Sequence, residues 1–339
     1  MLQSQSHPYV SVLVPIYNAQ DYLAQCLGAL SNQTLDNIEI IAINDGSTDR
    51  SLEIIQSFAM RDDRFRVVDK SNSGYGASMN IGLEIARGEY IGIVEPDDFP
   101  DLVMFGKLYK MAKRFDCDLV KCNFFERIDE RDRMTNNFRG FRKGVPFNPA
   151  DLPSIICTIP SIWTALYRKG MLDRAGIRFR ETPGAAFQDT SFTLKAWFEA
   201  SKCALVHRPM LHYRMDNPNA SSHTTDRVFV VCEELASAEE FLRERPERAS
   251  AFMPWFLVDK WGKYCWNYLR IDPSLHVEFA ERMREEYLAA RDAGELDLSL
   301  FEENVRAQVE LLINDGAQAF AERYPNGYEY TWRRPFSVW

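Results

Sequence analysis

The sequence has no C-x-x-C pair, because its seven cysteines, an odd number, are scattered from Cys26 to Cys265. That distribution argues against a zinc site and against a disulfide framework, and it predicts reduced, mostly buried thiols in a cytoplasmic protein. The N-terminus lacks a basic region followed by a long apolar core, so we expect no signal peptide. No apolar run approaches the roughly 18 residues that span a bilayer. At most, we expect a peripheral contact with the inner face of a cell membrane.

Positive charge is also in short supply, because 40 Lys and Arg oppose 49 Asp and Glu and leave a formal net charge of −9. Nonspecific binding of nucleic acid depends on a large cationic field, so we expect no nucleic-acid partner. Hydrophobic residues, at 46%, and charged residues, at 26%, have the proportions of a globular protein with a sizeable core.

Strand-like and helix-like segments alternate along the first hundred residues. Short β-favouring runs in "YVSVLVPIY", "IEIIAIN", "FRVVD" and residues 90–94 predict four strands. Helical spacing between them predicts helices at residues 21–30, at residues 52–58 with Ser47 or Thr48 as a cap, and at residues 77–87. This order predicts an α/β fold with a Rossmann-like, mostly parallel sheet and helices on both faces. Ligands of such sheets bind at the carboxyl ends of the strands.

The alternation loosens after residue 101, and a helical pattern runs from about residue 225 to residue 323. We predict strands in "IWTALYR" and "CALVHRPMLHYRM", a helix starting in "QDTSFTLKAWF", and a highly charged loop at residues 126–144. The predicted domains are a sheet domain at residues 1–223, with halves at 1–125 and 126–223, and a helical C-terminal domain at 224–339.

Concentrated negative charge ends the fourth predicted strand. In "GEYIGIVEPDDFPD" the carboxylates Glu95, Asp97 and Asp98 repel one another unless a positive group lies between them. Mg²⁺ and Mn²⁺ prefer oxygen ligands and commonly take one or two carboxylates together with substrate phosphates. Pro96 restricts the backbone here, and such stiffness suits a metal site. A solvated acidic turn is the alternative that spacing alone leaves open.

The turn "NDGSTD" after the second predicted strand carries the same ambiguity. Its residues are good turn formers, and a turn explains them fully. In the predicted sheet, however, Asp45 faces the same crevice as Asp97, where its carboxylate could accept a hydrogen bond from the N–H of a pyrimidine base.

Several ordered stretches resemble the family 2 glycosyltransferases of the GT-A fold: "VSVLVPIYNAQDYLAQCLGALSNQT", "IEIIAINDGSTD", "NSGYGASMNIGLEIARGEYIGIVEPDD" and "FQDTSF". The resemblance covers roughly half of the chain. It implies an enzyme that transfers a sugar from a nucleoside-diphosphate donor to an acceptor hydroxyl with inversion, usually with Mg²⁺ or Mn²⁺. Residues 1–125 would then be the nucleotide-binding half and residues 126–223 the acceptor and catalytic half.

The resemblance also implies roles for individual residues. Tyr17 would lie against the base, Asp45 would bind its uracil-like edge, and Asp97 would hold the metal. The donor-binding residues are predicted to be Pro15, Tyr17, Asp45, Glu95, Asp97 and Arg214. His223 is a second candidate metal ligand, and Arg214 could clamp a phosphate. A strand-end arginine and a loop histidine exposed to solvent are the alternative for this pair.

Asp189 matches the family's catalytic base, which takes the proton of the acceptor hydroxyl. From the sequence alone, Asp189 could instead be the N-cap of a helix. The chain departs from the family pattern at four positions, namely Asn44, Met79, Glu95 and Gln188. Glu95 replaces the first aspartate of the D-x-D motif, and Gln188 precedes the base. None of the departures removes Asp45, Asp97 or Asp189, so we expect an active enzyme.

The prediction is therefore a metal-dependent hexosyltransferase that uses a UDP-sugar and a glycan or lipid-linked acceptor in building a bacterial cell-envelope polysaccharide. A non-catalytic binding protein of the same fold is an alternative. A Rossmann oxidoreductase is another, although "PIYNAQ" stands where G-x-G-x-x-G would. The aromatic-rich residues 252–270 favour helical core packing or a homodimer, and a membrane-surface contact is the alternative.

Overall fold

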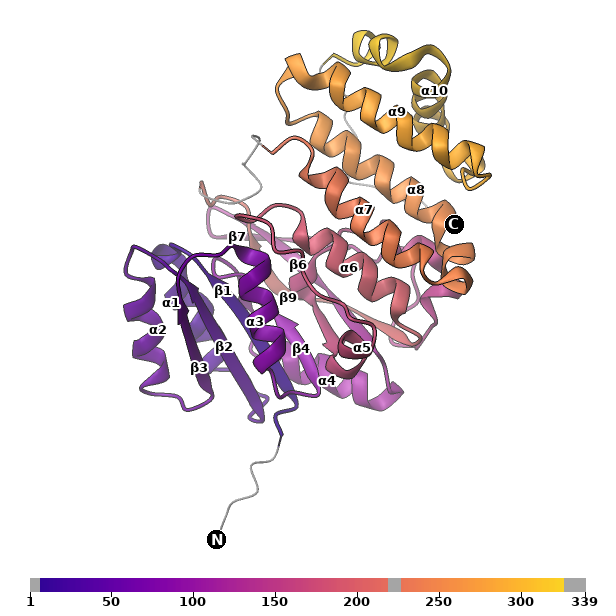
Figure 1. The fold of residues 1–339 in the computed structure, drawn as a ribbon. Helices are drawn as coiled ribbons and strands as arrows, with labels where there is room; N and C mark the ends of the chain where they lie inside the picture. Colours follow the sequence, from indigo (N-terminus) through magenta and orange to yellow (C-terminus); the bar gives the residue numbers. More distant parts are fainter. Residues whose placement is uncertain (1–6, 219–226, 326–339) are drawn as a thin grey trace. The chain divides into compact units, whose positions relative to one another are not determined.

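The computed structural model describes residues 7–218 and 227–325 (Figure 1). The chain divides into two compact units, of which one is Met1–Pro149 with Pro160–Asn219 and the other is Ala150–Ile159 with Ala220–Trp339. The first unit contains the sheet, and the second contains the C-terminal helices. None of the helices in the described part of the chain combines the length and the apolar character that crossing a membrane requires.

A nine-stranded sheet forms the centre of the first unit. Its strands are β1 (Val10–Ile16), β2 (Ile38–Asp45), β3 (Phe65–Lys70), β4 (Tyr90–Ile93), β5 (Phe99–Pro100), β6 (Leu119–Ile128), β7 (Arg131–Thr135), β8 (Ala165–Arg168) and β9 (Cys203–Arg214). The spatial order is β3-β2-β1-β4-β8-β6-β9-β5, with β7 paired to β6. Because β8 is antiparallel to both β4 and β6, the strands β1, β2, β3, β4, β6 and β9 share one direction. The sheet is mostly parallel, as predicted.

Helices cover both faces of this sheet. Those of the first unit are α1 (Gln20–Ser31), α2 (Ser51–Ala59), α3 (Tyr75–Ile85), α4 (Met104–Phe115), α5 (Lys169–Arg174) and α6 (Gln188–Glu199). A Cβ on Gly82 of α3 would meet the Leu13 side chain at 3.1 Å. A Cβ on Gly92, which pairs with Val12 and so faces the other way, would meet Phe105 of α4 at 2.6 Å. α3 and α4 therefore pack on opposite faces, which confirms the predicted α/β class.

Two local predictions are wrong. Residues 126–144 are not a single loop, because β6 continues to Ile128 and turns into β7. Asp129 and Glu130 have φ of 47° and 61°, the left-handed pair that a two-residue hairpin turn requires, and β7 is a charged edge strand that hydrophobic patterning does not detect. Helix α2 is not capped by Ser47 or Thr48, because it starts at Ser51 after Arg50.

The second unit is built from α7 (Val230–Arg243), α8 (Pro246–Tyr268), α9 (His276–Asp292) and α10 (Glu303–Arg323), as the helical pattern predicts. The aromatic side chains of α8 are core residues of this unit, since Phe252, Phe256, Trp261 and Tyr264 have no exposed surface. Lys260 is also buried and pairs with glutamates of α7 and α9. The seven cysteines are all buried, as expected, and all are thiols.

Candidate active site

The loops after β1 and β2 are tied together at the carboxyl ends of these strands. The backbone N–H of Asn18 donates to Ser47 Oγ at 3.0 Å, and the N–H of Thr48 donates to Asn18 Oδ1 at 2.8 Å. Pro15 is buried near the end of β1, whereas Tyr17 is 53% exposed. The Tyr17 ring is therefore free to stack on a planar group such as a base.

Asp45, the last residue of β2, is only 4% exposed, and its carboxylate organises the turn before α3. It accepts hydrogen bonds from the N–H groups of Ser73 at 2.8 Å and Gly74 at 3.0 Å, and it pairs with Lys70. Gly74 has a φ of 92°, a left-handed value that glycine adopts without strain. Asp45 thus fixes the start of α3 in addition to facing the carboxyl end of the sheet.

Glu95, Asp97 and Asp98 follow β4 and form a cluster of acidic side chains. Burial, opposed by a hydrogen bond from Tyr75 and assisted by the charges of Asp97 and Asp189, raises the pKa of Glu95 to about 8. That bond joins the Tyr75 hydroxyl to Glu95 Oε1 at 2.8 Å. Burial, followed by the charge of Asp97, also raises the pKa of Asp98. Like charges are crowded here, and a cation would relieve the repulsion.

Arg214, at the end of β9, braces the turn that carries these carboxylates. Its Nε donates to the backbone carbonyl of Asp97 at 3.1 Å, and its Nη2 donates to Gln25 Oε1 at 2.8 Å. The guanidinium is 4.6 Å from the centre of the Tyr22 ring. The backbone N–H of Arg214 donates to Asp98 Oδ1 at 2.9 Å. The side chain of this buried arginine is therefore bound by protein groups in this structure.

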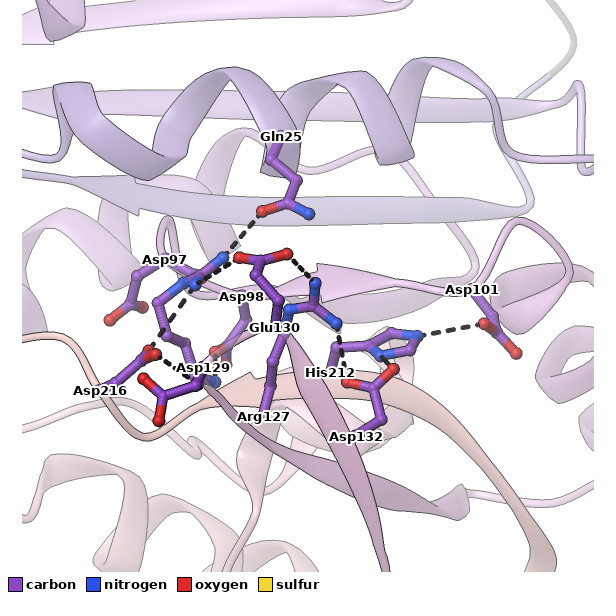
Figure 2. A network of polar contacts seen from close by, with 11 residues as sticks. Gln25, Asp97, Asp98, Asp101, Arg127, Asp129, Glu130, Asp132, His212 and Asp216 are labelled. Atoms are coloured by element: carbon purple, nitrogen blue, oxygen red, sulfur yellow. Dashed lines mark hydrogen bonds and ion pairs between the residues drawn. The ribbon is translucent and has the colours of Figure 1, made fainter.

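The β6–β7 hairpin joins the same network of polar contacts (Figure 2). His212 pairs through Nδ1 with Asp132 at 3.0 Å and through Nε2 with Asp101 at 3.4 Å. Its ring stacks on Phe99, with centroids 4.4 Å apart. The backbone N–H of Asp129, at the hairpin turn, donates to Asp216 at 2.9 Å. The hairpin is thereby fixed beside the turn that follows β4.

Asp189 lies in the first turn of α6, and its charge acts on the same cluster as Asp97 does. The N-cap of α6 is Phe187, so the interpretation of Asp189 as an N-cap is wrong. Phe187 has a φ of 60°, which is rare for a bulky side chain. The segment before α6 therefore ends at Phe187, two residues earlier than it would if Asp189 were the cap. The structure thus brings together Glu95, Asp97 and Asp189, and it joins Asp45 to them through the turn before α3. His223 lies outside the described residues.

The carboxylates fit a divalent cation in their chemistry. In residues 7–218 and 227–325, no group of three or more His, Cys, Asp or Glu is placed to hold a metal ion by itself. A cation shared with two phosphate groups needs only one or two protein carboxylates. Asp98 Oδ2 is buried and has no hydrogen-bond partner among the described residues, and Asp97 Oδ2 accepts a hydrogen bond from the Asn217 amide at 2.7 Å. Oxygen atoms in this state are suitable ligands for Mg²⁺ or Mn²⁺.

Sequence reasoning missed the side chains that hold the carboxylates in place. Tyr75, Asn217 and Gln25 have no signal of their own, because each acts on a residue that is distant in the chain. Tyr75 lies within the quoted stretch "NSGYGAS", but only the packing of α3 on the sheet directs its hydroxyl to Glu95.

Comparison with known proteins identifies the family. Residues 11–176 match the model of "Glycosyl transferase family 2". The "Uncharacterized glycosyltransferase EpsJ" of Bacillus subtilis is 34% identical over 229 residues, which are 63% of this chain and 62% of EpsJ. "Glycosyltransferase GlyG" of Streptococcus pneumoniae is 42% identical over 139 residues, 41% of this chain and 45% of GlyG. The match of residues 11–176 is therefore to glycosyl transferase family 2. It spans about three fifths of the length of relatives such as EpsJ, at 62%.

Solved structures agree on the fold. Residues 1–349 of TarS from S. aureus in complex with UDP-GlcNAc have a TM-score of 0.63 and 18% sequence identity, with 93% of this chain and 91% of that chain covered. The mannosyltransferase PcManGT from Pyrobaculum calidifontis, in complex with GDP-Man and Mn²⁺, has a TM-score of 0.50 and 16% identity, with 94% and 87% covered. Similarity at this level of identity establishes the fold alone.

Proposed function

We propose that the protein is an inverting glycosyltransferase that transfers a sugar from a nucleoside-diphosphate donor, best a UDP-sugar, to a hydroxyl of a glycan or lipid-linked acceptor. The family of residues 11–176 supports the reaction class. TarS was solved with UDP-GlcNAc, which supports a UDP-sugar, whereas PcManGT was solved with GDP-Man and Mn²⁺. The proposed metal is Mn²⁺ or Mg²⁺, held by Asp97.

One observation carries the proposal. The turn that follows β4 and the first turn of α6 bring Asp97 and Asp189 near Glu95, where burial and the charges of these two carboxylates raise the pKa of Glu95 to about 8. A fold that needed only a solvated turn would not hold Asp98 at 1% exposure beside the half-buried Glu95 and Asp97. A divalent cation and a diphosphate would use this arrangement, and the remaining carboxylate would be available as a base.

The chain's residues would divide the reaction between them. Tyr17 would stack on the base of the donor, and Asp45 would accept its N–H. Asp189 would accept the proton of the acceptor hydroxyl as that oxygen forms its bond to the anomeric carbon. The bond from the anomeric carbon to the diphosphate would break on the opposite face, and the nucleoside diphosphate would leave. A bound divalent cation would supply charge stabilisation of the leaving diphosphate.

Two substitutions test the two carboxylate roles. A thermal-shift panel of nucleotide sugars with Mn²⁺ first selects the donor. Asp97→Ala is expected to weaken Mn²⁺-dependent donor binding and turnover together. Asp189→Asn should leave donor binding within about threefold of the wild type, yet lower the transfer rate by ~10² or more, because an amide cannot accept a proton. Calorimetric donor titration and initial rates measure both effects.

Asp116→Asn is the matched control. It also exchanges a carboxylate for an amide, but near the amino end of β4, whereas the cluster lies at the carboxyl end. Asp116 pairs with Arg168, which lies opposite the first residue of β4, whereas the cluster follows its last residue. We expect wild-type rates in this variant. Full activity of Asp97→Ala would refute the metal site, and full activity of Asp189→Asn would refute the base. A wild type that binds a donor but never consumes it would be the non-catalytic binding protein.

A further inference from the structure

The segment from Phe179 to Phe187, which precedes the proposed base, lies directly on α3. The side chain of Asn80 exchanges two hydrogen bonds of 2.9 Å with the backbone N–H and C=O of Phe179. A Cβ on Gly76 would lie 1.9 Å from the carbonyl oxygen of Arg180, so only glycine permits this approach. The glycines of "NSGYGAS" thus serve to seat this segment, which we call the 179–187 segment.

Gln188 holds the other end of the 179–187 segment. The glutamine is 2% exposed. Its Nε2 donates to Thr182 Oγ1 at 2.8 Å and to the Gly184 carbonyl at 3.3 Å, and its Oε1 accepts from the Ala186 N–H at 2.5 Å. A carboxylate at this position could accept but could not donate. An amide is therefore required at this position, which is one of the four where the chain departs from the family pattern.

The contacts of Gln188 enclose the left-handed turn at Phe187. A bulky residue with a φ of 60° persists only where its surroundings impose that conformation. Gln188 binds three residues on the far side of the turn while its own backbone begins α6. Release of those contacts would let Phe187 relax, which would shift the first turn of α6 together with Asp189.

The same contacts extend to the donor side of the site. The Gly184 carbonyl that Gln188 binds also accepts the backbone N–H of Tyr75 at 3.2 Å. The hydroxyl of Tyr75 in turn donates to Glu95 Oε1 at 2.8 Å. A continuous chain of contacts therefore connects Gln188, Gly184, Tyr75 and Glu95.

We propose that Gln188 is a positioning residue of the transfer reaction: by holding the 179–187 segment, it sets the start of the helix that carries Asp189 and the Tyr75–Glu95 contact. This inference rests on the proposed function. Gln188 itself does not touch the reacting atoms, and its effect passes through Phe187 and Gly184.

Gln188→Met keeps the length of the side chain but removes all three hydrogen bonds. With the donor selected by the thermal-shift panel, we expect kcat for release of its nucleoside diphosphate to fall at least tenfold. Gln188→Glu should lose a similar factor, because it cannot donate. Phe187→Gly in the Gln188→Met background should recover part of kcat, since glycine adopts a positive φ freely. A purely structural role predicts no recovery.

Gln33→Met is the matched control. Gln33 is 4% exposed and makes the same pattern of bonds: Nε2 donates to the carbonyls of Ala29 and Asp101, and Oε1 accepts from the N–H of Phe105. The melting temperature of Gln33→Met should fall by about as much as that of Gln188→Met, while its kcat stays within twofold of the wild-type value. Both variants are assayed at a temperature where they are folded. Equal kcat losses in Gln33→Met and Gln188→Met, or no recovery with Phe187→Gly, would overturn the inference.

A measurement without turnover separates this inference from the proposed function. Hydrogen exchange at the Tyr75 and Ala186 amides should accelerate at least tenfold in Gln188→Met and remain at the wild-type rate in Gln33→Met. If the wild type consumes no nucleotide sugar, the proposed function fails, and unchanged exchange at these amides would independently overturn the role of Gln188.

Discussion

Arg214 offers the sharpest test of how the carboxylate cluster is held. We expect Arg214→Met to destabilise the first unit, because the guanidinium is 6% exposed and makes two side-chain hydrogen bonds, to the Asp97 carbonyl and to Gln25, besides its contact with the Tyr22 ring. Methionine retains an apolar side chain of similar reach but cannot replace any of these polar contacts.

The magnitude follows from the contacts. A hydrogen bond from a charged donor contributes about 1.5–3 kcal/mol, and a cation on an aromatic face contributes about 0.5–2 kcal/mol. Since methionine regains part of the apolar contact, the free energy of unfolding should fall by roughly 3–5 kcal/mol. In a unit of this size each kcal/mol corresponds to about 2–4 °C, so the melting temperature without ligand should fall by about 6–20 °C.

Thermal unfolding without ligand and calorimetric donor titration with Mn²⁺ measure the two consequences. Arg208→Met is the control on the same strand, because Arg208 is 55% exposed and forms a surface ion pair of 3.5 Å that contributes less than about 1 kcal/mol. An arginine that served only to clamp the donor phosphate would weaken donor binding and leave the unliganded protein as stable as the Arg208 control. That result would refute the bracing role.

Two further predictions, at Lys121 and at Gly76, concern the interior of the first unit. Burial lowers the pKa of Lys121 to about 7, while the unfolded side chain titrates near 10.4, so the unfolded chain binds the additional proton between these values. The free energy of unfolding of the wild type, relative to that of Lys121→Met, should therefore rise by about 1 kcal/mol per pH unit from about pH 7 to 10. Urea denaturation of both proteins measures this difference, and a difference that stays constant with pH would contradict the prediction. Gly76→Ala should destabilise by more than about 2 kcal/mol, because the new Cβ would lie 1.9 Å from the Arg180 carbonyl oxygen. In contrast, Gly28→Ala in α1, with nothing within 4 Å, should stabilise by about 0.5–1 kcal/mol, and equal stabilities of the two variants would disprove the close approach.

Much of the fold was accessible from local pattern. Residues 10–16 and 38–45 are buried throughout, and predominantly apolar runs of that kind are typical of parallel strands that are covered on both faces. The turn after each strand then follows from its Gly, Asn and Asp residues. Strand order and turn chemistry together therefore predict that Asp45 and Asp97 both lie at the carboxyl ends of the parallel strands.

Other features could not be predicted, because their local sequence is ordinary. β7 consists of charged and polar residues whose only strand signal is the partner that they pair with. Phe187 adopts a left-handed conformation that its side chain disfavours, so an aspartate two residues later was the more natural cap. Gln188 resembles any polar residue at the start of a helix, although its amide contacts three residues of the preceding segment.

The sequence by itself determined the order of strands and helices, the acidic turns and the family, because hydrophobic period and turn chemistry act over a few neighbouring residues. Only the tertiary structure decided what those turns rest on. Arg214 reaches Gln25 across 189 residues of chain, and Asn80 reaches Phe179 across 99. Such contacts depend on strand register and on how each loop returns to the sheet, and a side chain that is exposed in one register is buried in the next. The carboxylates were visible in the sequence, and the groups that hold them became visible only once the sheet had assembled.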